Sequence, residues 1–295
     1  MKKFFLAIIM LSLFSIENSN AQDNAITLKF NLPKGSSYDY NMDINMSMKG
    51  DAGGQAVSVE NKMGMGYHFT TLDDSAGWKK VSTTVSGISM HINTGGVNID
   101  YDSDQPGDTS NVVNNTMGKV LGAMKGAQFT FIMNDQGKIG YVSGIKEMTD
   151  KMAAAAPGNG GMAGGMSNAF NEDNFKQNIQ QAFGAYPDKP VKPGDSWTNS
   201  MNTNNNGVAL KIDNTYTLES VSGTNANVKV NSQISSANAN MPLTGTMAGT
   251  MQYDIPTGVV IDGALEMNMT MSVGQDAQST PMTMDIKTKI TGKKS

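Results

Sequence analysis

Methionine supplies the most unusual chemistry in this sequence of 295 residues. The chain holds 24 methionines and no cysteine, and many of the methionines stand two or four positions apart. These runs are Met42/Met46/Met48, Met63/Met65, Met267/Met269/Met271 and Met282/Met284. A thioether is a soft ligand for Cu(I), and it is also an adaptable apolar group that fits irregular greasy surfaces. The runs therefore allow three interpretations: a core filled by methionine, a surface that holds an apolar ligand, or a copper site.

The residue types that usually carry out catalysis are few or lack a partner motif. His68 and His91 each lie between two apolar residues of an alternating run, which predicts that both face away from the apolar side of a strand. Asp100, Asp102 and Asp104 offer oxygen ligands at alternate positions, but the glycine and distal glutamate of a calcium loop are missing. No Gly-x-Ser-x-Gly motif marks a nucleophile. We therefore predict no catalytic residue, no cofactor and no metal site other than the copper alternative, in a protein that is not an enzyme.

Most of the methionines belong to segments in which apolar and polar residues alternate. Residues 38–48 alternate without interruption, and residues 265–273 do the same near the C-terminus. A period of two places every apolar side chain of such a segment on one face of a strand. We therefore predict a sheet with a methionine- and tyrosine-rich face. The residues predicted to line a ligand there are Tyr38, Tyr40, Met42, Met46, Met48, Met63, Met65, Met267, Met269 and Met271.

The order of the predicted elements divides the chain after residue 21 into two β-rich units. Residues 22–144 form the first unit, with a short helix near 112–125, and residues 185–295 form the second. Residues 145–184 form a helical, glycine-rich insert between them. The fold class is mainly β with some helix. We predict a curved antiparallel sheet or half-barrel, built from two tandem units that form one continuous domain, with two packed sheets as the alternative.

Three local patterns add detail to this architecture. Residues 26–32 alternate and predict a first strand, whereas residues 93–111 are rich in Gly, Asp and Asn and predict a loop. The alternation changes phase between Val85 and Ile88, which predicts a β-bulge near Gly87.

The N-terminus predicts export. Two lysines precede an apolar stretch at residues 4–14, and a small residue, Ala21, follows a polar segment, so we predict a signal peptide over residues 1–21 that is cleaved after Ala21. No later stretch is long and apolar enough for a transmembrane helix. The net charge is −4 and the chain has no arginine, which argues against nucleic-acid binding. We therefore expect the mature protein in the periplasm or outside the cell.

Several turn and strand signatures resemble a known bacterial family. They are the opening strand signature of residues 28–30, Lys34-Gly35-Ser36-Ser37-Tyr38, the hairpin at Gly137, and Tyr186-Pro187-Asp188-Lys189-Pro190-Val191-Lys192-Pro193-Gly194-Asp195-Ser196-Trp197. Together they resemble the secreted and lipid-anchored proteins of the domain-of-unknown-function family 6263. The resemblance implies an envelope location and carries over no catalytic residue. The half-barrel pattern is also similar to that of periplasmic lipoprotein carriers, which is an analogy of fold only.

These observations together predict a non-enzymatic envelope protein. The Met/Tyr-rich sheet face would bind a lipid-like or other apolar small molecule, or the apolar segment of a client protein, by shape and burial alone. A structural scaffold without a ligand is the alternative, and Cu(I) binding by methionine is a minor one.

Overall fold

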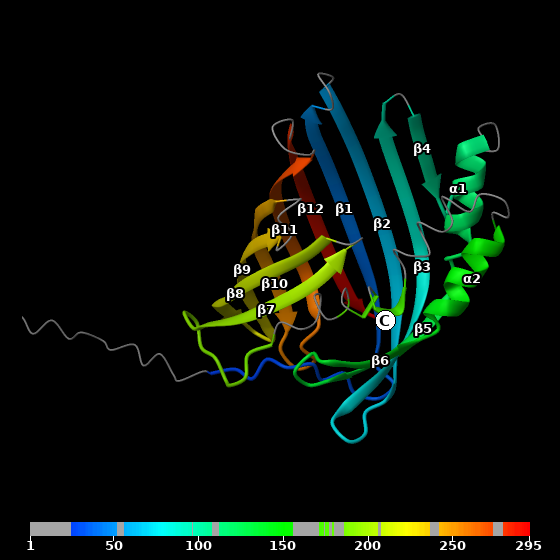
Figure 1. Cartoon of the computed structure of the whole chain (residues 1–295). Coiled ribbons are helices and arrows are strands. Elements are labelled where there is room, and N and C mark those ends of the chain that lie inside the picture. Colours follow the sequence, from blue (N-terminus) through cyan, green and yellow to red (C-terminus); the bar gives the residue numbers. More distant parts are fainter. Residues whose placement is uncertain are drawn as a thin grey trace, which may run out of the picture.

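In the part of the chain that it describes, the computed structural model has one curved antiparallel sheet and two long helices (Figure 1). This architecture confirms the predicted mainly β fold with a curved sheet, and it replaces the alternative of two packed sheets. The residues that the structure describes are 25–51, 56–95, 97–107, 112–155, 171–173, 175–176, 179, 186–205, 208–236, 242–273 and 280–295. The predicted signal peptide and most of the glycine-rich part of the insert lie outside them.

The described elements alternate long strands with short turns, apart from one helical region. In chain order they are β1 (Ser37–Asp51), β2 (Ala56–Asp73), β3 (Trp78–Thr94), β4 (Val97–Asp102), α1 (Val112–Gly122), β5 (Gln128–Asn134), β6 (Ile139–Ser143), α2 (Ile145–Ala155), β7 (Ser196–Asn205), β8 (Val208–Ser222), β9 (Asn225–Ser236), β10 (Leu243–Asp254), β11 (Val260–Val273) and β12 (Thr280–Lys294).

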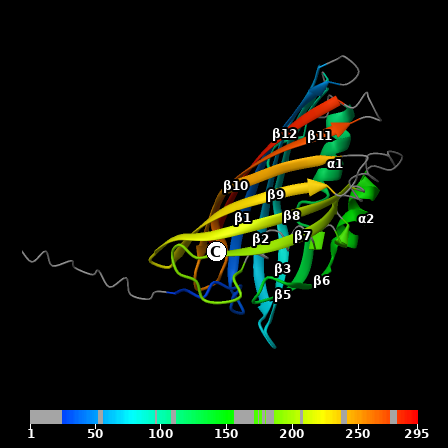
Figure 2. The same cartoon turned by 60° about the vertical axis from the view of Figure 1, so that its left-hand side comes forward.

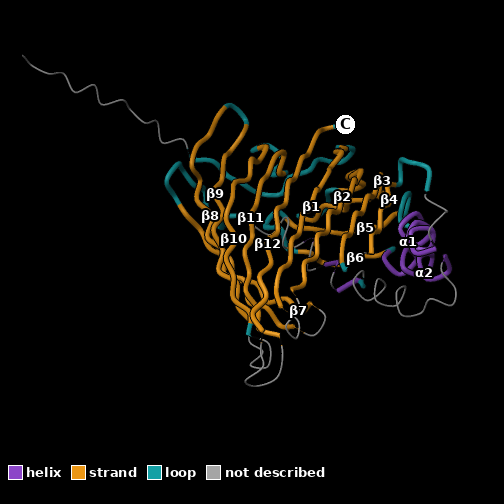
Figure 3. The backbone as a smooth tube through the Cα atoms, turned by 90° about the horizontal axis from the view of Figure 1, so that it is seen from above, coloured by secondary structure: helices purple, strands orange, loops and turns teal. Residues whose placement is uncertain are grey.

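The twelve strands form one sheet in the order β6-β5-β3-β2-β1-β12-β11-β10-β9-β8-β7, with β4 paired to β3. The first and last strands, β1 and β12, lie side by side in the middle and join the N-terminal and C-terminal halves. Within the described part of the chain, the outermost strands β6 and β7 do not pair with each other, so the sheet remains open. Figures 2 and 3 show the sheet curving from β8 and β9, through β12 and β1, to β5 and β6. A duplication of two β units stays a prediction.

A bulge interrupts the pairing of β2 and β3 where the phase change in the sequence predicted it. Gly66 lies opposite Gly87, but the next pair is Tyr67 with Val85, so one strand carries an extra residue. A Cβ atom on Gly66 would lie 2.6 Å from the Ser86 Oγ and 3.3 Å from the Gly87 N, so a larger side chain there would require neighbouring atoms to shift. Bulges and strand glycines increase local bending. This irregularity therefore contributes to the curvature of the sheet.

One end of the curved sheet is closed by the N-terminal segment, and here the prediction of a first strand over residues 26–32 was wrong. The only bridge made by this segment joins Ile26 to Val191. Its other backbone hydrogen bonds go to turns: the Phe30 N–H donates to the Asp135 carbonyl (2.9 Å) and the Asn31 N–H to the Thr257 carbonyl (2.8 Å). Asp135 lies in the turn between β5 and β6, in the N-terminal half of the sheet. Thr257 lies in the turn between β10 and β11, in the C-terminal half. The segment therefore crosses the base of the structure, burying the side chains Leu28, Phe30 and Leu32.

The helical region differs from prediction at one point. Residues 97–102 form strand β4 on the edge of β3, within the stretch that predicted a loop. Helix α1 confirms the helix expected near 112–125, and it packs on β4 so closely that a Cβ on Gly118 would lie 3.3 Å from the Tyr101 ring. Helix α2 confirms a helix at the start of the insert. Both helices lie at the β4–β6 end of the sheet (Figure 3).

Thr83 offers a test of the packed core. Its side chain is fully buried between Phe69 on β2 and Phe129 on β5, and its hydroxyl has no hydrogen-bond partner. An unsatisfied buried hydroxyl is destabilising, so Thr83→Val is expected to raise the free energy of unfolding by roughly 1 kcal/mol. Urea unfolding measures this change. Thr84→Val, which alters the opposite face of the same strand, is expected to leave the midpoint unchanged. A loss of stability in Thr83→Val would show that the hydroxyl is satisfied.

Candidate functional site

The structure places the ten predicted ligand-lining residues on one face of the sheet but divides them into two groups. Directly paired residues of an antiparallel sheet point to the same side. The predicted residues on β2 pair directly with residues of β1, and those on β11 are linked to β1 through pairs with β12. Tyr38, Tyr40 and Met65 are buried in the core, with exposed fractions of 4%, 8% and 6%. The other seven are half-buried. Only these seven remain available to a ligand.

The half-buried residues form rows that cross neighbouring strands. Met48 on β1 lies opposite Met284 on β12, which lies opposite Met269 on β11. On either side of this row, Met282 pairs with Met271, and Ile286 pairs with Met46 and Met267. We call the half-buried apolar residues of β1, β2, β11 and β12 that lie beyond the buried aromatic residues the methionine face. Its members are Met42, Ile44, Met46, Met48, Val57, Val59, Met63, Leu265, Met267, Met269, Met271, Met282, Met284 and Ile286.

The methionine face continues into a tightly packed aromatic core at the closed end. The Tyr40 and Phe69 rings are 5.5 Å apart, and the Tyr186 and Tyr253 rings are 6.3 Å apart. The Tyr186 hydroxyl donates a hydrogen bond to the Gly258 carbonyl (2.8 Å), which ties the chain after the insert to the turn before β11. Burial raises the pKa of Tyr40 and of Tyr186 well above the usual range of a phenol. These tyrosines therefore stay neutral and act as packed aromatic groups.

The opposite face of the same strands is polar. Both histidines lie there, as their position in the alternating runs predicted: His68 Nδ1 is 2.7 Å from Asp39 Oδ1, and His91 Nδ1 is 3.9 Å from Asp100 Oδ2. The hydrogen bond from His68 lowers the pKa of the Asp39 carboxyl. All four side chains are substantially exposed. Both histidine side chains lie on the side of the sheet opposite the methionine face.

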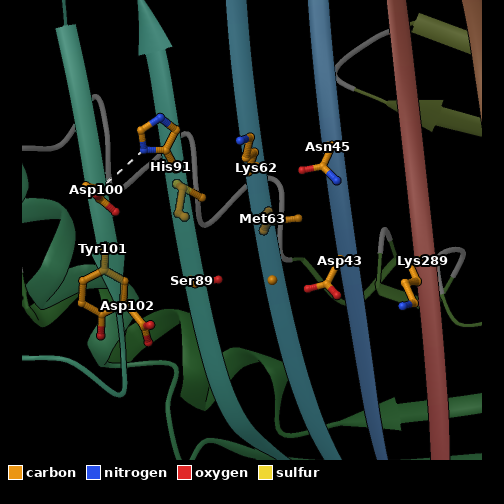
Figure 4. Close-up of a pocket in the computed structure, with 12 residues that line it drawn as sticks. Asp43, Asn45, Lys62, Met63, Ser89, His91, Asp100, Tyr101, Asp102 and Lys289 are labelled. Carbon is orange, nitrogen blue, oxygen red and sulfur yellow. Dashed lines mark ion pairs between the residues drawn. The ribbon is translucent and has the colours of Figure 1, made fainter.

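A depression of about 460 Å³ opens on this polar face (Figure 4). Gly64 leaves room at its floor, where Ser89 and Asp43 lean inward. Within the described chain, no group of three histidine, cysteine or acidic side chains is placed to hold a metal ion. Lysines and carboxylates line the depression together, which leaves it with mixed charge. The sequence did not reveal this feature because one wall is β4, which had been predicted as a loop.

The chemistry that the methionine face offers is apolar contact and thioether ligation. Met48, Met284 and Met269 stand on three adjacent strands, where flexible thioethers can approach one another. Three thioethers could bind Cu(I) without help from nitrogen or oxygen. The copper alternative therefore depends on sulfur alone and stays a prediction.

Comparison with solved structures finds weak likenesses. A structure of lipovitellin, solved to examine lipid–protein interactions, matches at a TM-score of 0.46 and 11% identity over 88% of this chain, which spans 25% of the lipovitellin chain. The translocator domain of the autotransporter NalP from Neisseria meningitidis has a TM-score of 0.23 and 7% identity, covering 88% of this chain and 89% of that one. A Bacteroides fragilis protein with a YmcC-like fold, described as exported, has a TM-score of 0.25 and 14% identity, covering 88% and 97%. These TM-scores are too low to support a functional assignment.

Sequence comparison gives a clearer result. No curated protein matches the chain. Neither described helix has the length and apolar character needed to cross a bilayer. A model of a family of unknown function, DUF6263, matches residues 76–260, which is more than half of the chain. The match includes β3 to β10 and therefore most of both arms of the sheet. The chain belongs to the DUF6263 family of unknown function.

Proposed function

We propose that this protein is an exported, non-enzymatic carrier that holds a lipid-like molecule on the methionine face. The observation that supports the proposal most directly is a contiguous set of half-buried apolar side chains on β1, β2, β11 and β12, whose opposite face is polar. Soluble proteins rarely leave a large apolar patch open to water unless it binds something. Burial and shape would then be the contribution of these residues, with no bond made or broken.

The composition of the face favours an alkyl chain as the occupant. Methionine is unbranched, has three rotatable side-chain bonds and carries a polarisable sulfur, so neighbouring methionines adapt to a flexible chain. The methionine face spans four strands, β2, β1, β12 and β11, and the aromatic core closes it at one end. An acyl chain lying along the face would thus meet apolar atoms over much of its length. The apolar segment of a client protein could use the same contacts, and the ligand-identification experiment below distinguishes the two.

The alternative is a scaffold whose sheet is covered by its own helices. In the described structure, the principal contacts of α1 and α2 are with each other, with β4 and with β5. The methionine face lies on other strands, namely β1, β2, β11 and β12. This arrangement leaves the face half-exposed and so favours a carrier over a scaffold.

Native mass spectrometry of the protein purified from an exporting bacterial host tests the proposal. We expect a mass above that of the polypeptide, with the extra mass released by organic solvent and identified as a lipid-like molecule. A released peptide would instead identify a client protein as the occupant. A polypeptide-only mass, together with no fluorescence increase from the apolar probe N-phenylnaphthylamine, would contradict the carrier and favour the scaffold.

A further inference from the structure

Asn61 places an unpaired hydrogen-bond acceptor beside the methionine face. Its Oδ1 atom is buried and has no hydrogen-bond partner. Thr71 and Thr83 also carry buried hydroxyls without partners, but both lie in the closely packed part of the core. Asn61 is different because its residue is only half-buried and lies near the open end of β2. A buried acceptor that remains unpaired is unfavourable, so its retention calls for a physical explanation.

The sheet register puts the Asn61 side chain among the apolar rows. Asn61 lies opposite Met46 on β1 and opposite Ile92 on β3. Along β2 it follows Val59 and precedes Met63, both of which are half-buried on the same face. It therefore interrupts an apolar series with a single amide. Met46 next to it is flexible, so its thioether can move aside to admit a ligand atom.

We propose that Asn61 is the polar anchor of this face and that the ligand carries a hydroxyl at the end of an alkyl chain. The inference rests on the proposed function. A hydroxyl donates to the amide oxygen and satisfies the acceptor that the protein leaves unpaired. The methionine face contains no carboxylate, so a buried ammonium headgroup would lack a counter-charge. An ionised carboxylate headgroup could accept from the Asn61 Nδ2 but has no hydrogen to donate to Oδ1, so it would leave that acceptor unpaired. A neutral hydroxyl meets both conditions.

Two probes of equal apolar length test this inference. Dodecanol and dodecyl methyl ether share the same alkyl chain, but only the alcohol donates a hydrogen bond. In displacement of N-phenylnaphthylamine from the full mature protein, we expect the alcohol to bind about tenfold more tightly than the ether, as one net hydrogen bond would give. In Asn61→Leu, both compounds should still bind, and the preference should disappear. Leucine has a similar size and removes the unpaired acceptor, and thermal unfolding confirms that the variant is folded.

The matched control makes the same substitution on the opposite face. Asn45 on β1 is exposed on the polar side, so Asn45→Leu is expected to keep the tenfold preference. Equal affinity of the unmodified protein for alcohol and ether would overturn the anchor while leaving the carrier function intact. A preference that survives in Asn61→Leu would also overturn it. Failure of both compounds and of the fluorescent probe to bind would contradict the proposed function itself.

Discussion

Replacing Met46 and Met269 together by glutamate is expected to abolish binding of N-phenylnaphthylamine, with affinity falling about a hundredfold. Both side chains belong to the methionine face, on β1 and β11 respectively. A ligand that covers a carboxylate removes it from water without supplying a partner, and a penalty of roughly 3 kcal/mol corresponds to that fold-change. Titration of the probe, followed by its fluorescence, measures the effect.

The control for this variant moves the same two charges to the other side of the same strands. Asn45 precedes Met46 and Asn268 precedes Met269, and both are exposed on the polar face. Asn45→Glu with Asn268→Glu is therefore expected to bind the probe as the unmodified protein does. Equal losses in the two double variants would show that net charge, rather than the methionine face, controls binding. No loss in either variant would place the binding surface elsewhere.

Replacing Phe131 by alanine is expected to lower the free energy of unfolding by about 3–5 kcal/mol. The ring is 2% exposed and meets Phe69 edge-on at 6.4 Å between centroids. Its removal leaves a cavity between β5 and β2 that the surrounding strands fill only in part. A change of this size is a large fraction of the stability of a typical domain. Urea unfolding followed by tryptophan fluorescence measures the midpoint.

A neighbouring aromatic residue on the solvent side provides the comparison. Tyr141 on β6 is 45% exposed, so Tyr141→Ala is expected to change stability by less than about 0.5 kcal/mol. A small effect of Phe131→Ala, close to that of Tyr141→Ala, would mean that the aromatic end of the structure is loosely packed. Close packing there would confine the proposed occupant to the methionine face.

The strict alternation of the sequence was sufficient to predict which side chains share a face. Residues 38–48 and 265–271 alternate without interruption, and a period of two leaves no freedom in their orientation. The phase change before Ile88 likewise identified the bulge opposite Gly66. What alternation cannot supply is register between distant strands. The row of Met48, Met284 and Met269 depends on β1 pairing with β12, and no local pattern specifies that contact.

Other features depended on contacts that are equally non-local. Residues 26–32 alternate like a strand, but their hydrogen bonds go to turns near Asp135 and Thr257 instead of a neighbouring strand. Tyr38 and Tyr40 share the period of the methionines, yet the aromatic core covers them. Asn61 did carry a signal, because it occupies an inward position between Val59 and Met63. This amide at an apolar position of an alternating series is the sequence feature that corresponds to the proposed anchor.

The central claim is that an apolar ligand lies on the methionine face. Photo-crosslinking of a diazirine-bearing dodecanol to the mature protein, followed by peptide mass spectrometry, tests it most directly. We predict that fragmentation of the labelled peptides assigns the label to side chains of the methionine face within residues 42–48, 265–271 and 282–286, rather than to the polar residues that alternate with them, and that the peptide containing Phe131 is spared. Label confined to the polar face, or spread evenly over the chain, would contradict the claim.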